Sequence, residues 1–120
     1  VFDLHTGMEL EKLQQYDVVY ICGGNTRYLL ERINATGFHD SLMAYINDNG
    51  FVMGVSAGSI IFANNLENNL GLADTKLDVH CITGESRGKM AYPLKKNVKL
   101  TNTCALVIRD FPDGVEIIGE

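Results

Sequence analysis

The chain has 120 residues and a formal net charge of −5, because 10 Lys and Arg face 15 Asp and Glu. Hydrophobic residues make up 46% of the chain and charged residues 21%, a balance typical of a globular protein and not of a disordered one. The acidic balance disfavours nucleic acid and anionic membranes as partners, since both attract basic surfaces. The length predicts a single domain over residues 1–120.

The first half of the chain alternates between expected strands and helices. Val1 begins a short apolar run to Leu4, and Thr6 with Glu9 forms a capping-box pattern that predicts a helix to about Tyr16. The expected elements that follow are a strand at 17–22, helices at 27–34 and 38–48, a strand at 51–55 and an apolar helix to about residue 66. Nearly unbroken apolar strands are typical of parallel strands covered on both faces. This order predicts a parallel sheet with helices on its faces.

The second half is expected to be loop and strand. Residues 64–75 are polar and rich in Asn, which predicts a loop, and a strand at 77–82 and a loop at 83–88 follow. The end of the chain predicts antiparallel strands at 98–101, 104–109 and 115–118, with a Pro112-Asp113-Gly114 turn that closes a C-terminal β-hairpin.

The segment Gly54-x-Ser56-x-Gly58 has the spacing of a nucleophile elbow, and it follows an apolar strand directly. A serine on a tight strand-to-helix turn needs small neighbours, because the backbone there is strained. The alternative is a glycine-rich turn with an incidental serine. The pattern predicts Ser56 as a nucleophile.

A second glycine-rich segment, Gly23-Gly24-Asn25, follows the preceding expected strand. Open α/β sheets place their sites at such strand ends. The N–H groups of Gly24 and Ala57 are the expected donors to an oxyanion. An ordinary turn is the alternative reading of this segment.

A serine nucleophile needs a base, and His80 is the best placed of the three histidines because it follows the serine in sequence and ends the stretch Leu77-Asp78-Val79-His80. The three cysteines form no C-x-x-C pair, which predicts free thiols and a cytoplasmic location. They are Cys22, Cys81 and Cys104.

Together, Gly-Gly-Asn-Thr after a strand, Gly-x-Ser-Ala-Gly, a later His and Gly-Glu-Ser-Arg resemble the peptidase E (α-aspartyl dipeptidase) family, peptidase family S51. The resemblance spans residues 17–120. It implies a class I glutamine amidotransferase-like, flavodoxin-like fold, with three α/β/α layers around a mostly parallel sheet. It also implies a Ser56 nucleophile, a His80 base, oxyanion donors at Gly24 and Ala57, and no metal or organic cofactor.

The resemblance also implies how a substrate is held. Gly84-Glu85-Ser86-Arg87 is similar to the Gly-Glu-Thr-Arg of that family, whose arginine is implicated in gripping an acidic side chain. Asn25, Glu85 and Arg87 are therefore expected to bind a small acidic peptide, and a guanidinium can bind a carboxylate through two hydrogen bonds. A solvated charged loop is the alternative.

The acid of the family's Ser-His-Glu triad has no clear counterpart. The matching position offers Asn102, an amide that can orient a histidine without stabilising its positive charge. Asp78 and Asp74 are the substitutes, and Asp78 is expected on the same strand face as His80. A catalytically inactive interaction or regulatory domain is therefore the alternative to a serine peptidase.

Relative to that family, the chain is expected to lack N-terminal strand and helix units and to be the C-terminal portion of a longer domain. The loss of such units exposes strand edges and the surface that helices cover. A homo-oligomer or a complementing chain is the expected partner. An amidotransferase is disfavoured because those enzymes use cysteine at the elbow, and an α/β-hydrolase is disfavoured by the short chain.

Overall fold

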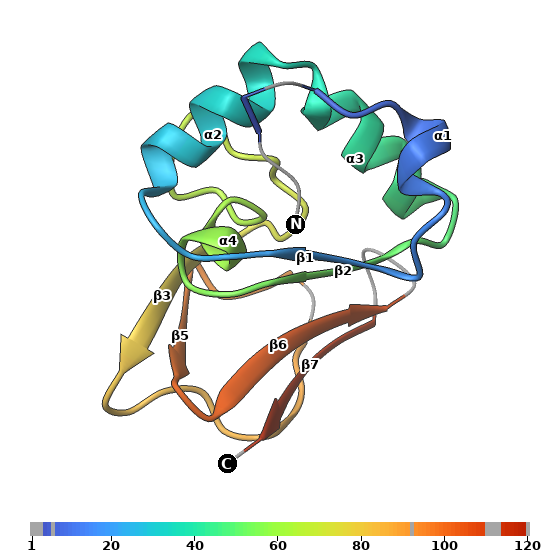
Figure 1. Cartoon of the computed structure of the whole chain (residues 1–120). Helices are drawn as coiled ribbons and strands as arrows, with labels where there is room; N and C mark the ends of the chain where they lie inside the picture. Colours follow the sequence, from blue (N-terminus) through green and yellow to red (C-terminus); the bar gives the residue numbers. More distant parts are fainter. Residues whose placement is uncertain (1–3, 6, 92, 110–113, 120) are drawn as a thin grey trace. The chain divides into compact units, whose positions relative to one another are not determined.

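The computed structural model describes residues 4–5, 7–91, 93–109 and 114–119 (Figure 1). Most of the expected strand at 1–4, the Thr6 cap and most of the 112–114 turn lie outside these residues. The chain divides into two compact units, unit 1 over Val1–Ser59 and unit 2 over Ile60–Glu120.

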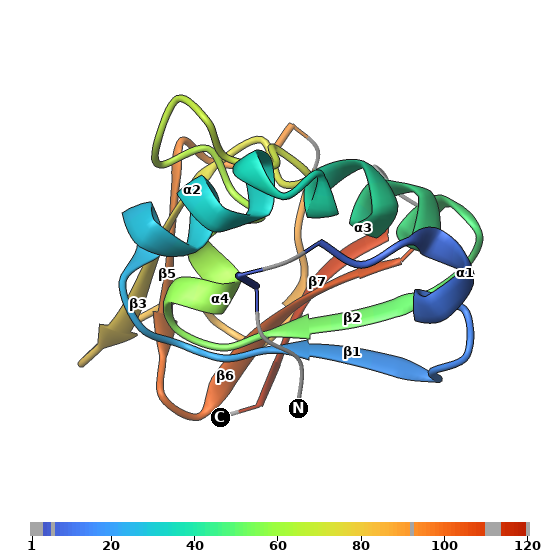
Figure 2. The same ribbon diagram turned by 45° about the horizontal axis from the view of Figure 1, so that its top comes forward.

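Unit 1 is built on a short parallel pair of strands, β1 (Val18–Ile21) and β2 (Phe51–Gly54). The helices α1 (Leu10–Leu13), α2 (Thr26–Ala35) and α3 (Phe38–Asn47) lie on one side of this pair (Figures 1 and 2). The parallel pair and helices α2 and α3 confirm the predicted order. The first helix is shorter than predicted and begins after Glu9, which makes no side-chain cap hydrogen bond.

Helices α2 and α3 supply most of the buried side chains of unit 1. Their buried residues recur at intervals of three and four, which places them along one face of each helix. They are Leu30 and Ile33 on α2, and Phe38, Leu42 and Tyr45 on α3. Gly37 separates the two helices in the left-handed region, with φ of 75°. The phenol of Tyr45 also donates to the carbonyl of Tyr16, 3.0 Å away, and ties α3 to the segment before β1.

The prediction that the strand at 17–22 is covered on both faces is wrong for the described residues, and its neighbour β2 is exposed in the same way. Alternate apolar side chains of β1 and β2 are about half exposed: Val18, Tyr20, Phe51 and Met53. The register pairs Val18 with Phe51 and Tyr20 with Met53, so these side chains share one face. Unit 1 therefore presents an apolar sheet face opposite its helices.

The helix predicted to reach residue 66 is also wrong, because α4 ends after one turn (Ala57–Ile60). The backbone carbonyls that would continue it accept hydrogen bonds from the following loop instead. Asn69 Nδ2 donates to Ile60 O at 2.8 Å, and Leu70 N donates to Ile61 O at the same distance. The Asn-rich loop thus competes successfully with the helix for the same acceptors.

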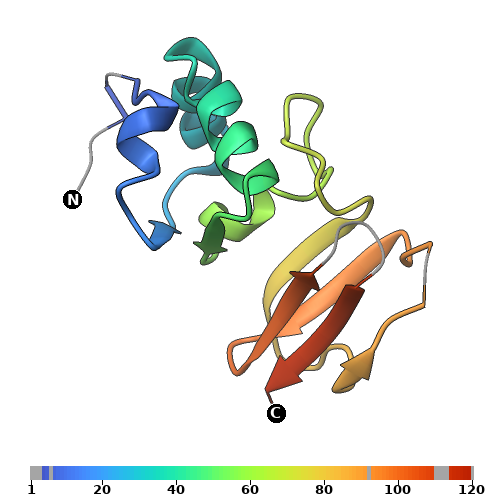
Figure 3. The same ribbon diagram turned by 90° about the vertical axis from the view of Figure 1, so that its right-hand side faces the viewer.

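Unit 2 consists of two small sheets, seen from another side in Figure 3. The strands β3 (Lys76–Cys81) and β5 (Asn97–Thr101) pair in parallel. The strands β4 (Gly88–Lys89), β7 (Gly114–Gly119) and β6 (Cys104–Arg109) form an antiparallel sheet in that order. The β6–β7 pairing confirms the C-terminal hairpin.

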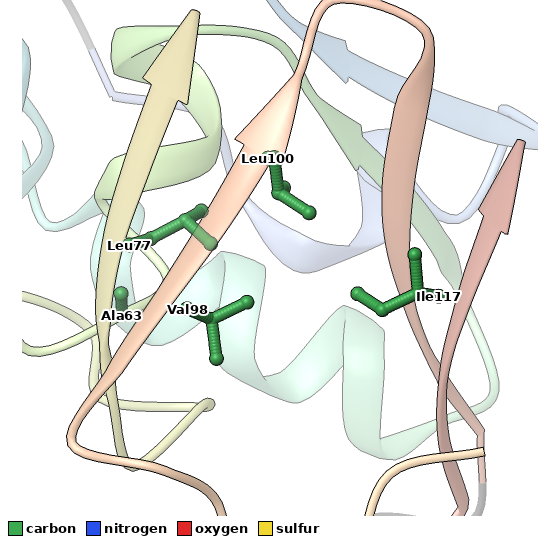
Figure 4. Packing of buried hydrophobic residues seen from close by; sticks show 5 residues of the cluster. All are labelled: Ala63, Leu77, Val98, Leu100 and Ile117. Atoms are coloured by element: carbon green, nitrogen blue, oxygen red, sulfur yellow. The ribbon is translucent and has the colours of Figure 1, made fainter. Parts of the chain in front are cut away.

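The prediction that 98–101 is an antiparallel strand is wrong, because β5 pairs in parallel with β3. The pairing puts alternate apolar residues of both strands into one core, as Figure 4 shows for part of it. This core of unit 2 contains Ala63, Leu77, Val98, Leu100 and Ile117. Among the described residues, no helix is long and apolar enough to cross a membrane.

Candidate active site

The carboxyl ends of β1 and β2 meet at one edge of unit 1. Ile21 pairs with Gly54, and Val55 N extends the ladder by donating to Ile21 O at 3.1 Å. A side chain added at Gly23 would place its Cβ 3.1 Å from Ser56 Cβ and 3.6 Å from Ser56 Oγ. The glycine-rich loop after β1 therefore runs directly past the serine after β2.

Ser56 occupies a strained turn between β2 and α4. Its φ is 57°, a left-handed conformation that costs a non-glycine residue about 1–2 kcal/mol. A Cβ at Gly54 would overlap the carbonyl oxygen of Gly58, and a Cβ at Gly58 would overlap that of Ile21. The two flanking glycines are thus required by close backbone approach, as expected for a nucleophile elbow.

The two expected oxyanion donors lie on the same edge of unit 1. Gly24 has φ of 140°, and the space where its Cβ would stand is open. Ala57 is the first residue of α4, so its N–H has no acceptor within the helix. Asn25 has a different use from the one expected: its Oδ1 accepts from Tyr28 N at 3.0 Å and caps α2.

His80 lies in unit 2, near the end of β3, where the strand pairing is irregular. The register shifts between Asp78 and Cys81, which leaves two residues of β3 opposite one residue of β5. His80 adopts φ of 59° within this β-bulge. Such bulges change the direction of a side chain, and they are frequent beside active sites.

The imidazole of His80 is held by an amide. Its Nδ1 lies 2.6 Å from Asn102 Oδ1, on the turn that follows β5. Because an amide oxygen only accepts hydrogen bonds, Nδ1 must carry the proton. The other ring nitrogen, Nε2, then carries the lone pair that a general base needs.

The two aspartates considered as substitutes for the triad acid bond elsewhere. Asp78 Oδ2 accepts from Asn97 Nδ2 at 2.8 Å, and Asp74 Oδ1 accepts from Asn64 Nδ2 at 3.0 Å. The bulge also interrupts the alternation that was expected to put Asp78 and His80 on one face. Of the three candidates, the structure brings Asn102 to the histidine.

The Gly-Glu-Ser-Arg loop is fixed to β5 of unit 2. Glu85 N donates to Lys99 O at 2.9 Å, and the Glu85 carboxylate accepts from Lys95 Nζ at 2.6 Å. This hydrogen bond with Lys95 is the main cause that holds the pKa of Glu85 below its ordinary value of 4.5. Arg87 is exposed. An open hollow of about 490 Å³ lies beside the loop, lined by Gly84, Glu85, Ser86, Lys89, Met90, Ala91, Pro93 and Lys95.

Three residues at these positions were not found from the sequence. Lys95 is the partner of Glu85, Asn97 holds Asp78, and Ser59 Oγ donates to Ser56 O at 2.6 Å. The first two join residues that lie 10 and 19 positions apart in the chain, and no motif indicates either contact. Ser59 stands next to the elbow motif, so its position was a signal that could have been read.

Comparisons with known proteins identify the family of this chain. The family model described as peptidase family S51 matches residues 4–81. The chain is 30% identical over 100 residues to the uncharacterized peptidase Lmo0363 of Listeria monocytogenes, covering 83% of this chain and 40% of that protein. It is 33% identical over 57 residues to the uncharacterized peptidase PM1590 of Pasteurella multocida, covering 48% of this chain and 28% of that protein.

A solved structure shows the same fold. The crystal structure of a provisionally assigned peptidase E protein from Listeria monocytogenes EGD-e aligns with a TM-score of 0.73 and 23% identity. The alignment covers 99% of this chain and 68% of that one. The chain therefore has an α/β fold like that structure, and it spans less than half the length of the two curated relatives.

Proposed function

Because the chain belongs to peptidase family S51, we propose that it carries the site of a serine peptidase that cleaves small peptides with an N-terminal aspartate. The observation that supports this most is the left-handed Ser56, held between two obligatory glycines and beside the Gly23-Gly24 loop. Strained backbone at a side chain that can act as a nucleophile points to function more than to folding.

In the proposed reaction, Ser56 Oγ attacks the peptide carbonyl and its proton passes to His80 Nε2. The N–H groups of Gly24 and Ala57 stabilise the oxyanion of the tetrahedral intermediate. His80 then protonates the leaving amine, and an ester of Ser56 remains. Water, deprotonated by the same histidine, hydrolyses this ester and restores the serine.

Asn102 takes the place of the third triad member in this proposal. Its hydrogen bond to Nδ1 fixes the tautomer and the orientation of His80. An amide lacks the charge that would stabilise an imidazolium, so we expect a slower reaction than a carboxylate would support. Asn102 is therefore a positioning residue.

Recognition of the substrate falls to the loop of Arg87 and Glu85. Arg87 is exposed and can grip the carboxylate of an aspartyl side chain through two hydrogen bonds. The ion pair of Glu85 with Lys95 supports this assignment, because it holds the loop that carries the arginine. In unit 1, Asn25 caps α2 through its Oδ1, and we propose that its Nδ2 donates to the substrate.

A catalytically inactive domain is the second candidate, and Asn102 is the observation that favours it. A histidine without a carboxylate partner lacks the negative charge that stabilises its imidazolium, as expected of a site that has lost its triad. Reaction with a fluorophosphonate separates the two candidates, because only a working elbow forms the covalent adduct at Ser56.

The proposal also covers the cellular location, the layers of the fold and the partner of the protein. We place it in the cytoplasm, since the free Cys22 is exposed and suits a reducing compartment. We propose three α/β/α layers, with a second copy or a complementing chain on the exposed face of β1 and β2. A stable compact monomer in size-exclusion chromatography would contradict the last point.

The decisive experiment is hydrolysis of Asp-containing dipeptides by the wild type, Ser56→Ala and His80→Ala. We expect each variant to lose at least about a thousandfold in kcat. Ser41→Ala and His39→Asn, on α3, are matched controls that should keep the wild-type rate. Wild-type activity in Ser56→Ala would reject the proposal.

A further inference from the structure

Ser59 contacts the backbone of Ser56 and has no part in the proposed reaction. Its Oγ donates to the carbonyl oxygen of Ser56 at 2.6 Å, and its backbone N–H donates to the same oxygen at 2.9 Å. Ser56 and Ser59 both belong to unit 1, and their side chains are half-buried. The carbonyl of the left-handed serine is therefore fixed from two sides.

This carbonyl shares a rigid unit with the expected oxyanion donor. The peptide bond between Ser56 and Ala57 is planar, and in its ordinary trans form the C=O and N–H point in opposite directions. A restraint on the Ser56 carbonyl thus also sets the direction of the Ala57 N–H. Any rotation of this peptide would break both hydrogen bonds of Ser59 and turn the N–H away from the carbonyl that Ser56 attacks.

We propose that the Ser59 hydroxyl is a positioning group that holds the Ala57 N–H in its catalytic orientation. The inference rests on the proposed function for its catalytic consequence. Preorganised donors act in the transition state without a cost of reorientation, which is why their alignment affects kcat more than KM. Removal of one oxyanion donor typically costs about a hundredfold to a thousandfold. Ser59 keeps its backbone donor when the hydroxyl is lost, so about a tenfold loss is expected.

The chain offers a matched control for an ordinary helical contact. Thr36 Oγ1 donates to Arg32 O, also at 2.6 Å, at the end of α2. Serine and threonine often bond back to a carbonyl of the preceding turn without any role beyond the helix. Thr36→Ala removes such a bond in a helix that does not contain the elbow. It should lower the free energy of unfolding without changing kcat.

The test compares Ser59→Ala with Thr36→Ala on the purified protein. We expect Ser59→Ala to lower kcat about tenfold and to leave KM within about twofold. An aspartyl aldehyde, which forms a tetrahedral adduct with the serine, should bind about tenfold more weakly, whereas inhibition by free aspartate should not change. Equal losses for the aldehyde and aspartate, or the same kcat loss in Thr36→Ala, would overturn the inference.

A measurement without catalysis keeps this test separate from the proposed function. The backbone amide of Ala57 should give one sharp NMR signal in the wild type and a broadened or doubled one in Ser59→Ala. An unchanged signal overturns the inference even if the enzyme is active. If Ser59→Ala does not fold, Ser59→Cys preserves the volume with a weaker donor, and an unchanged kcat and Ala57 signal in that variant would also overturn it.

Discussion

Ser56 in unit 1 and His80 in unit 2 are both non-glycine residues in the left-handed region, with φ of 57° and 59°. Asn49 shares this conformation among the described residues, but it follows α3, where an asparagine is an ordinary helix ending. The two reactive candidates are held by different means. The serine depends on a short continuous segment, whereas the histidine depends on the pairing of two strands.

The difference lies in the distance along the chain between the partners. The turn of Ser56 is fixed by Gly54, Gly58 and Ser59, all within four residues of it. The bulge of His80 is fixed by β5, and its imidazole bonds to Asn102, 22 residues away. A local turn can form wherever its sequence occurs, but a bulge exists only when the correct register forms. The position of the base is therefore the more sensitive of the two to changes elsewhere in its unit.

The largest effect is expected from a side chain inside the local turn. In Gly58→Ala the new Cβ would overlap the carbonyl of Ile21, so β1 and the elbow cannot keep their present approach. We expect a loss of about 3–4 kcal/mol in the free energy of unfolding, measured by urea denaturation, and no fluorophosphonate labelling.

Gly37→Ala is the matched control for this change. Gly37 also has positive φ, at 75°, but nothing lies within 4 Å of the position of an added Cβ. Only backbone strain is added, at a cost of about 1 kcal/mol. Equal costs for the two variants would mean that close approach does not hold the elbow.

The next largest effect concerns the distant partner of the histidine. Asn102→Ala removes the acceptor that orients the imidazole through Nδ1. We expect kcat/KM to fall about a hundredfold, equivalent to about 2.7 kcal/mol. Asn102→Asp should raise kcat above that of the wild type, because a carboxylate stabilises the imidazolium.

Asn97→Ala tests whether Asp78 takes part instead. This variant removes the hydrogen bond that Asp78 accepts and leaves Asn102 in place. We expect its kcat/KM to stay within about threefold of the wild type, as for a polar contact outside the site. A loss larger than that of Asn102→Ala would transfer the orienting role to Asp78.

The smallest effect is expected from the ion pair of Glu85 and Lys95. The pair lowers the pKa of Glu85 in the folded protein, so its stabilisation is present above pH 4.5 and is lost as pH falls through the lowered pKa. Lys95→Met should cost less than about 1 kcal/mol at pH 7, because the lysine is largely exposed.

The dependence on pH identifies the cause of this small effect. The stabilities of Lys95→Met and the wild type should converge as pH falls through the lowered pKa of Glu85, because the protonated carboxyl no longer attracts the lysine. Lys96→Met, next in the chain, controls for the loss of one positive charge. A difference between Lys95→Met and the wild type that stays constant as pH is lowered would assign the stability to packing of the lysine stem.

The sequence by itself determined the features whose causes are local. Periodicity predicts the helices α2 and α3 and the parallel order of β1 and β2. Glycine spacing predicts the elbow around Ser56, and turn residues predict the C-terminal hairpin. The family also followed from motifs, since the residues that form an elbow must be neighbours in the chain.

Only the tertiary structure decided the features that depend on competition between distant groups. The helix after Ser59 ends early because Asn69 and Leu70 take its carbonyls. The strand at Val98 pairs in parallel because its apolar residues share a core with β3. The same pairing gives His80 its bulge and Asn102 as its partner. Register is a property of two strands together, so no pattern within either strand could specify it.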